Sequence, residues 1–262
     1  MTNIDEKTDA FNKLLGIMDD LRAQCPWDRE QTFESLRHLT IEETYELSEA
    51  VLDKDVDSIK KELGDLMLHL VFYAKIGSEQ GQFDFGDVLN YINEKLVYRH
   101  PHIYGDVSVK DAQNVKENWE KIKLNEGRDS VLSGVPKSLP PLVKAYRIQE
   151  KAKGVGFDWE KPEQVWEKVL EEMNELKQEA EQGSNKDAME HELGDLLFAL
   201  VNYARFIGVN PENALERTNK KFISRFQHLE SKAKEIGRSL KDMNLTEMDV
   251  FWEEAKRAEG RE

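Results

Sequence analysis

The sequence predicts an all-α protein that contains two similar helical domains in tandem. Segments in which β-branched or aromatic residues alternate with polar ones are missing, so no strand prediction competes with helix. Charged residues make up 34% of the 262 positions and hydrophobic residues 39%, a balance typical of long helices in a soluble protein. Part of the first half also returns in the second half, which indicates a duplicated unit.

The duplication is clearest in two apolar segments. ELGDLMLHLVFYAKI at 62–76 matches ELGDLLFALVNYARF at 192–206 in nine of fifteen positions. An acidic element, EExxE, lies upstream of both segments, at 42–46 and at 171–175. Two copies in the same order predict tandem domains, because a solenoid needs more and shorter repeats.

A segment that interrupts helices separates the two copies. Residues 126–141 contain three of the seven prolines and two glycines, which is typical of a linker. We therefore expect an N-terminal domain over 1–125 and a C-terminal domain over 142–262.

Each domain is expected to contain four helices that carry the same motifs in the same order. The first helix carries EExxE, the second ExxD, the third a Lys/Arg pair and the fourth a tryptophan. The expected helices are 33–53, 56–79, 84–99 and 111–125 in the first half, and 162–182, 186–207, 211–236 and 246–258 in the second. Pro211 fits this assignment, because the first turn of a helix tolerates proline.

The charge and the cysteine content exclude several classes of protein. With 52 acidic and 37 basic residues the net charge is −15, so we expect no binding to nucleic acid or anionic membranes, which need a basic face. The single cysteine, Cys25, rules out an intrachain disulfide and favours a reducing compartment. The N-terminus lacks a signal-peptide pattern, and the most apolar segment, 66–74, is far shorter than the roughly 20 residues that span a bilayer. We therefore expect a cytoplasmic protein.

The EExxE elements place pairs of carboxylates on one face of a helix. Glu43 and Glu46 are three residues apart, so they are neighbours on that face, and the same holds for Glu172 and Glu175. Like charges in this arrangement repel, which suggests that a cation lies between them. The alternative is a solvated acidic face, which is common in a chain this acidic.

The ExxD elements stand at the entrance to strongly apolar segments. Glu62 and Asp65 precede LMLHLVFYA, and Glu192 and Asp195 precede LLFALVNYA. A helix that is apolar all round is expected to be buried, where an unpaired carboxylate is costly. Metal coordination would solve this, although acidic residues are also favoured in the first turn of any helix. Carboxylates supply only oxygen ligands, which suit Mg²⁺, Mn²⁺ or Ca²⁺.

The ordered and duplicated set of motifs resembles the MazG family of nucleoside triphosphate pyrophosphohydrolases. The resemblance covers nearly the whole chain, including CPWD at 25–28 and RHPH at 99–102. It implies all-α domains that dimerise as a helical bundle of the four-helix type. It also implies Mg²⁺-dependent (Mn²⁺ is an alternative) hydrolysis of NTPs and dNTPs, including non-standard ones, to NMP and pyrophosphate. The metal ligands it implies are Glu172, Glu175, Glu192 and Asp195, with Glu43, Glu46, Glu62 and Asp65 as N-terminal counterparts.

Basic residues of the second half could neutralise a triphosphate. Lys221 and Arg225 share one helix face, and Lys168 lies one turn before Glu172. Each could equally be an ordinary surface residue, and Trp252 could either stack on a base or hold the last helix in place. The resemblance favours five nucleotide contacts: Lys168, Glu171, Lys221, Arg225 and Trp252.

The proposed catalytic step uses a metal-activated water. A carboxylate, Glu171 or Glu172, would orient or deprotonate this water. Attack at the α-phosphorus is implied by the resemblance and not by the spacing. We expect the C-terminal half to be the main catalyst. A lysine expected shortly before the second ExxD is missing, since Ala188 and Met189 stand there, and Lys186 is a possible substitute.

Two other enzyme classes fit poorly, and one non-enzymatic class stays open. A ferritin-like di-iron bundle needs Glu-x-x-His, and no histidine here has a glutamate three residues earlier. A P-loop NTPase needs a Gly-Lys dipeptide, which the sequence lacks. A helical dimer that serves as an interaction scaffold, with acidic faces that only solvate it, remains an alternative.

Overall fold

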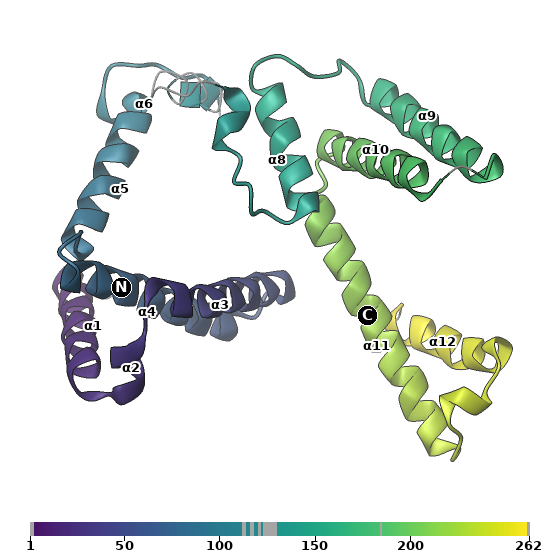
Figure 1. The fold of residues 1–262 in the computed structure, drawn as a ribbon, viewed down its shortest axis with the longest axis horizontal. Coiled ribbons are helices and arrows are strands. Elements are labelled where there is room, and N and C mark those ends of the chain that lie inside the picture. Colours follow the sequence, from purple (N-terminus) through teal and green to yellow (C-terminus); the bar gives the residue numbers. More distant parts are fainter. Residues whose placement is uncertain are drawn as a thin grey trace. The chain divides into compact units, whose positions relative to one another are not determined.

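A computed structural model describes residues 3–111, 114–115, 118–119, 122, 130–183 and 185–260. In these residues the regular secondary structure is helical, with no strand (Figure 1). The chain divides into two compact units, Met1–Lys110 and Asp111–Glu262. The all-α, two-unit prediction is therefore confirmed.

The first unit is built around a helical hairpin formed by α3 and α4. A tight turn joins them: Lys54 adopts a left-handed conformation (φ 57°), and the Asp55 side chain then accepts the backbone N–H groups of Asp57 and Ser58 to cap α4. The helices of this unit are α1 (Ile4–Gln24), α2 (Pro26–Glu30), α3 (Phe33–Asp53), α4 (Val56–Glu79), α5 (Phe85–Arg99) and α6 (Pro101–Tyr104).

The core of the first unit lies where α1, α3 and α4 meet. Its fully buried side chains are Met18, Leu36, Val71, Phe72 and Ile76. All of the buried residues from α4 lie in its C-terminal half, so the hairpin is anchored at one end.

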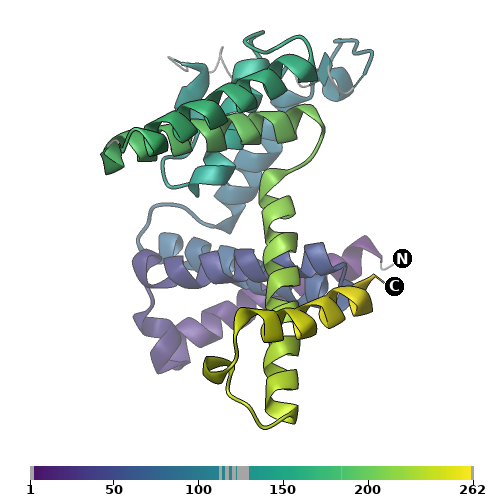
Figure 2. The same ribbon diagram turned by 90° about the vertical axis from the view of Figure 1, so that its right-hand side faces the viewer.

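The second unit contains an equivalent hairpin formed by α9 and α10. Pro162 opens α9, and Asn185 caps α10 by accepting the backbone N–H of Ala188 at 2.9 Å. Helix α8 packs against α10, and the long helix α11 leaves the end of α10 and carries α12 along its side (Figures 1 and 2). The elements are η1 (Val131–Gly134), α8 (Pro141–Lys153), α9 (Pro162–Glu181), α10 (Lys186–Phe206), α11 (Pro211–Glu235), η2 (Leu240–Asp242) and α12 (Leu245–Glu259).

The expected helices agree with the structure to within about a residue at most ends. The expected helix 111–125 lies mostly outside the described residues. The domain boundaries 1–125 and 142–262 stay a prediction, because residues 126–129 of the expected linker 126–141 lie outside the described residues. Its described portion contains η1, which packs against α8. Helices α1 and α8 were not predicted as separate elements.

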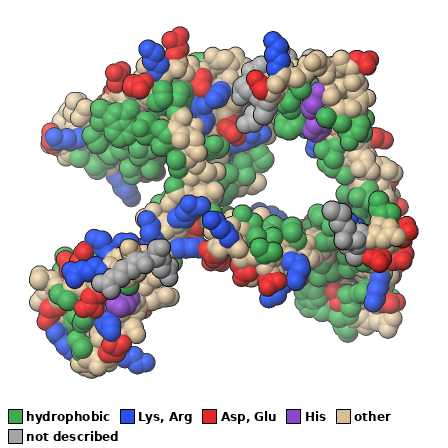
Figure 3. Space-filling model, turned by 180° about the vertical axis from the view of Figure 1, so that it is seen from behind, with side chains coloured by type: hydrophobic (Ala, Val, Ile, Leu, Met, Phe, Trp, Pro, Cys, Tyr) green, Lys and Arg blue, Asp and Glu red, His purple; other side chains and the backbone are tan. Residues whose placement is uncertain are grey.

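The expectation that the ExxD helices are apolar all round and therefore buried is wrong for a single chain. In α4, Leu63 and Leu70 are each 52% exposed, and in α10, Leu197 is 49% exposed. Each hairpin covers only one side of these helices, so the opposite apolar face remains open. Figure 3 shows hydrophobic side chains gathered on the surface of the molecule. Despite these apolar faces, none of the described helices could cross a membrane.

Candidate active site

A cluster of three carboxylates lies between α9 and α10. Glu172, Glu192 and Asp195 each offer an oxygen, and these oxygens all lie within 4.8 Å of one another. Glu172 is buried, Glu192 is half-buried and Asp195 is exposed. The hairpin turn sets this register, so two motifs twenty residues apart in sequence meet at one point. The predicted convergence of EExxE and ExxD is therefore present in the structure.

The first unit has a matching cluster between α3 and α4. It consists of Glu43, Glu62 and Asp65, whose oxygens also lie within 4.8 Å of one another. Burial and the neighbouring charges of Asp65, Glu46 and Glu62 raise the pKa of Glu43 above its usual value. These carboxylates therefore repel one another, and a bound cation would relieve the repulsion.

Glu46 and Glu175 lie at the margin of the two clusters. Neither belongs to the groups whose oxygens converge within 4.8 Å. The pKa of Glu175 is nevertheless raised, by desolvation and by the charges of Glu172 and Glu192, so it shares their electrostatic environment. Its role as a metal ligand stays a prediction.

Lys168 supplies a positive charge to the second cluster. Its Nζ lies 2.7 Å from Oε1 of Glu172 and 2.9 Å from Oε1 of Glu171. Hydrogen bonds to these two carboxylates raise the pKa of Lys168 well above its usual value. In the first unit the position one turn before Glu42 holds Leu39, so the matching cluster lacks this ammonium group. The two clusters therefore differ in charge.

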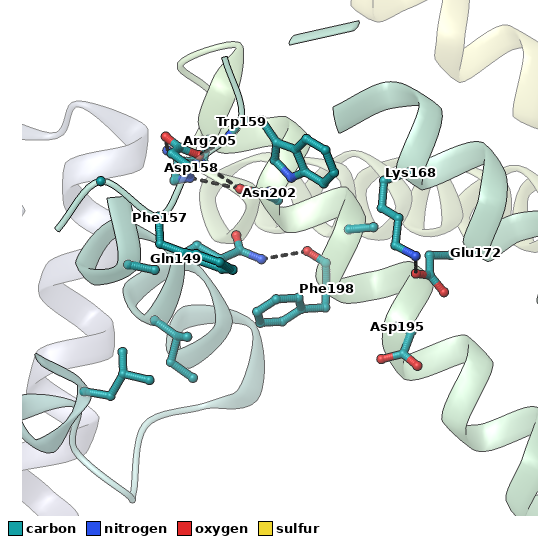
Figure 4. A pocket seen from close by; sticks show the side chains of 15 residues that line it. Gln149, Phe157, Asp158, Trp159, Lys168, Glu172, Asp195, Phe198, Asn202 and Arg205 are labelled. Atoms are coloured by element: carbon teal, nitrogen blue, oxygen red, sulfur yellow. Dashed lines mark hydrogen bonds and ion pairs between the residues drawn. The ribbon is translucent and has the colours of Figure 1, made fainter. Parts of the chain in front are cut away.

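A cavity of about 630 Å³ opens beside the second cluster. Lys168, Glu172 and Asp195 line one end, and the aromatic rings of Phe157 and Trp159 line the other (Figure 4). The remaining lining residues are Leu132, Ile148, Gln149, Ala152, Gly156, Asp158, Phe198, Ala199, Asn202 and Arg205. The loop that carries Phe157, Asp158 and Trp159 was not predicted from the sequence as part of the site.

A buried ion pair fixes the loop at the aromatic end. Arg205, whose side chain is 6% exposed, pairs with both oxygens of Asp158, one of them at 3.0 Å. Arg205 Nε also donates to Oδ1 of Asn202 at 3.1 Å. Asp158 in turn accepts the backbone N–H of Trp159 at 3.0 Å. These bonds tie the loop between α8 and α9 to α10.

The structure does not bring all the predicted nucleotide contacts together. Lys221, Arg225 and Trp252 lie on α11 and α12, while α11 runs away from the α9–α10 hairpin (Figure 2). Arg225 pairs with Glu259 and lies 5.8 Å from the centre of the Trp252 ring. Trp252 also packs against Phe222, with ring centres 5.1 Å apart. The docking role of Trp252 is thus observed, and its contact with a nucleotide stays a prediction.

Comparison with known proteins identifies the family. The model of the family described as "MazG nucleotide pyrophosphohydrolase domain" matches residues 31–104 and 160–230, which together are more than half of the chain. These ranges contain both carboxylate clusters. The chain therefore belongs to the MazG nucleotide pyrophosphohydrolase family, with two such domains in tandem, and is a hydrolase.

Full-length relatives support this assignment. The chain is 43% identical over 251 residues to a Thermotoga maritima protein named nucleoside triphosphate pyrophosphohydrolase/pyrophosphatase MazG, covering 94% of this chain and 95% of that one. It is 42% identical over 257 residues to an Escherichia coli nucleoside triphosphate pyrophosphohydrolase, covering 95% and 98%. It is also 47% identical to the Bacillus subtilis protein YabN, covering 96% of this chain and 52% of that one.

Proposed function

We propose that this enzyme hydrolyses NTPs and dNTPs, including non-standard ones, to NMP and pyrophosphate in a Mg²⁺-dependent reaction, and so cleans the nucleotide pool. The observation that carries this proposal is the carboxylate cluster at one end of a cavity large enough for a nucleotide. The names of the full-length relatives agree with it.

Glu172, Glu192 and Asp195 would hold the metal, with Glu175 close enough to share in the site. Three carboxylates that repel one another form an oxygen donor set that suits Mg²⁺, and Mn²⁺ could replace it. When bound, the ion would neutralise phosphate charge and lower the pKa of a bound water.

The side chains around the cluster have distinct roles in this proposal. Glu171, which is more exposed than Glu172, accepts a proton from the attacking water or orients it. The water oxygen forms a bond to the α-phosphorus, and the bond from that phosphorus to the bridging oxygen breaks to release pyrophosphate. Lys168 leaves Glu172 and donates to the phosphate oxygens, where it stabilises the developing charge.

A homodimer fits the apolar faces that each hairpin leaves open. On α10 this face includes Leu193 and Leu197, which are nearly half exposed. Because α11 leaves the hairpin, Lys221, Arg225 and Trp252 would reach the carboxylates from a second copy. A cytoplasmic location fits a chain with a single cysteine. The net charge of −15 argues against nucleic acid as a partner.

The C-terminal cluster is the main catalytic site in this proposal, because only it has an ammonium group in the position of Lys168. A matched pair of variants tests both points. Full-length protein, Glu172→Gln and Glu43→Gln are incubated with eight NTPs and dNTPs, with Mg²⁺ or with EDTA.

We expect turnover to require Mg²⁺, to fall by about 100-fold or more in Glu172→Gln, and to change by less than about threefold in Glu43→Gln. Equal losses in both variants would overturn the assignment to the C-terminal cluster. Turnover in EDTA would overturn the metal role. No turnover of any nucleotide would favour the interaction scaffold.

A further inference from the structure

The aromatic end of the cavity contains an unpaired hydrogen-bond acceptor. Gln149, on α8, is only 6% exposed and lines the cavity. Its Nε2 donates to the backbone carbonyl of Phe198 at 2.8 Å, as Figure 4 shows. Its Oε1 is buried and has no hydrogen-bond partner among the described residues. A buried acceptor without a donor costs free energy, so a ligand that brings a donor gains that energy back.

The orientation of the Gln149 amide is fixed by its neighbour. The carbonyl of Phe198 can only accept, so the NH₂ group must face it and the oxygen must face away. Rotating the amide would set two acceptors against each other. Gln149 therefore presents an acceptor, and not a donor, to a ligand.

The charged groups at this end, Arg205 and Asp158, are already engaged with each other. The guanidinium of Arg205 is shared between Asp158 and Asn202. Among the described residues that line the cavity, Gln149 is the one with a buried, unpaired polar side-chain atom. The rings of Phe157 and Trp159, which are 82% and 46% exposed, offer surfaces on which a flat ring can stack.

We propose that the aromatic end of this cavity is the nucleobase subsite and that Oε1 of Gln149 accepts a hydrogen bond from an exocyclic amino group of the base. The inference rests on the proposed function, because a nucleotide must place its phosphates at the Lys168 and Glu172 end. Within the broad substrate range of the proposed function, it favours amino bases, adenine and cytosine, over their oxo counterparts, hypoxanthine and uracil, which would bind more weakly. An oxo group would set its oxygen against Oε1 and leave both acceptors unpaired.

Calorimetric titration of the full chain with nucleoside monophosphates tests base recognition apart from hydrolysis. We expect AMP to bind about 10- to 100-fold more tightly than IMP, and CMP more tightly than UMP by a similar factor. Purine riboside monophosphate, which lacks the amino group but adds no oxygen, should also bind more weakly than AMP.

Gln149→Met removes the acceptor and keeps the side-chain length. In this variant we expect the ratio of AMP to IMP affinity to fall to within about threefold. Glu150→Gln, on the same helix, is the matched control and should keep the wild-type ratio. If Gln149→Met does not fold, the comparison of AMP, IMP and purine riboside monophosphate on the wild-type chain decides the question alone.

Equal binding of AMP and IMP, no binding of either, or an unchanged ratio in folded Gln149→Met would overturn the inference. Failure of the proposed function looks different. In that case AMP and IMP would still be discriminated, but no triphosphate would be hydrolysed. Hydrolysis of ATP without discrimination between AMP and IMP would instead keep the function and refute the subsite.

Discussion

Replacing Lys168 by methionine tests whether its ammonium group neutralises the carboxylate cluster when no metal ion is bound. The variant keeps the aliphatic stem and leaves Glu172, whose side chain is 8% exposed, next to two other carboxylates without its 2.7 Å partner. The Lys168 side chain is 38% exposed, so solvent screens part of the pair, and loss of the partner of Glu172 costs about 1–3 kcal/mol. For a unit of roughly 150 residues each kcal/mol lowers Tm by about 2–4 °C, so we expect a decrease of about 2–12 °C in EDTA.

Mg²⁺ should reverse most of this loss, because the cation supplies the charge that Lys168 provided. Differential scanning calorimetry with and without Mg²⁺ should therefore show a larger metal-induced rise in Tm for Lys168→Met than for the wild type. Lys177→Met is the matched control, since Lys177 pairs with Glu181 at 3.6 Å on the exposed side of the same helix. Exposed pairs contribute about 1 kcal/mol or less. A Lys168→Met protein that melts like the wild type, with the same response to Mg²⁺, would refute this reasoning.

Two further predictions concern the first unit. Thr40→Val removes a hydroxyl that lies 2.9 Å from Nδ1 of His69 and 2.7 Å from the hydroxyl of Tyr73. It should lower the free energy of unfolding, measured by urea titration, by about 1–3 kcal/mol. A change below about 0.5 kcal/mol would contradict this prediction. The second concerns Glu79, whose pKa is lowered by its hydrogen bond to Arg22. This pair stabilises the fold above the unfolded pKa of about 4.3 and loses its effect as pH falls through the lower folded pKa. Glu79→Gln should therefore destabilise the protein at pH 7 and flatten the loss of stability in acid, and parallel acid dependence in both proteins would refute the assignment.

The sequence predicted the carboxylate cluster because its geometry is local. Residues three apart on a helix share a face, and a short turn must bring two consecutive helices side by side. Glu172, Glu192 and Asp195 therefore converge as the motifs predict. The expected bounds of α3 and α4 also agree with the structure, in which Thr32 and Asp55 cap the two helices.

The base end of the cavity could not be predicted in this way. Gln149 lies on α8, and its contact with the carbonyl of Phe198 depends on how α8 packs against α10, 49 residues away in sequence. No spacing encodes that contact. The burial of the apolar segments was predicted wrongly for a related reason. The sequence of a helix that is apolar all round does not show whether its own chain or another surface covers it. The exposure of Leu63 and Leu197 was therefore not predicted.

Hydrolysis in ¹⁸O-labelled water tests the central claim most directly. The wild-type enzyme is incubated with its best triphosphate and Mg²⁺, and the isotope shift is read by ³¹P NMR. Attack at the α-phosphorus predicts ¹⁸O in the NMP and none in pyrophosphate. Label in pyrophosphate would move the attack to the β-phosphorus, and NDP with labelled inorganic phosphate would contradict the proposed pyrophosphohydrolase reaction.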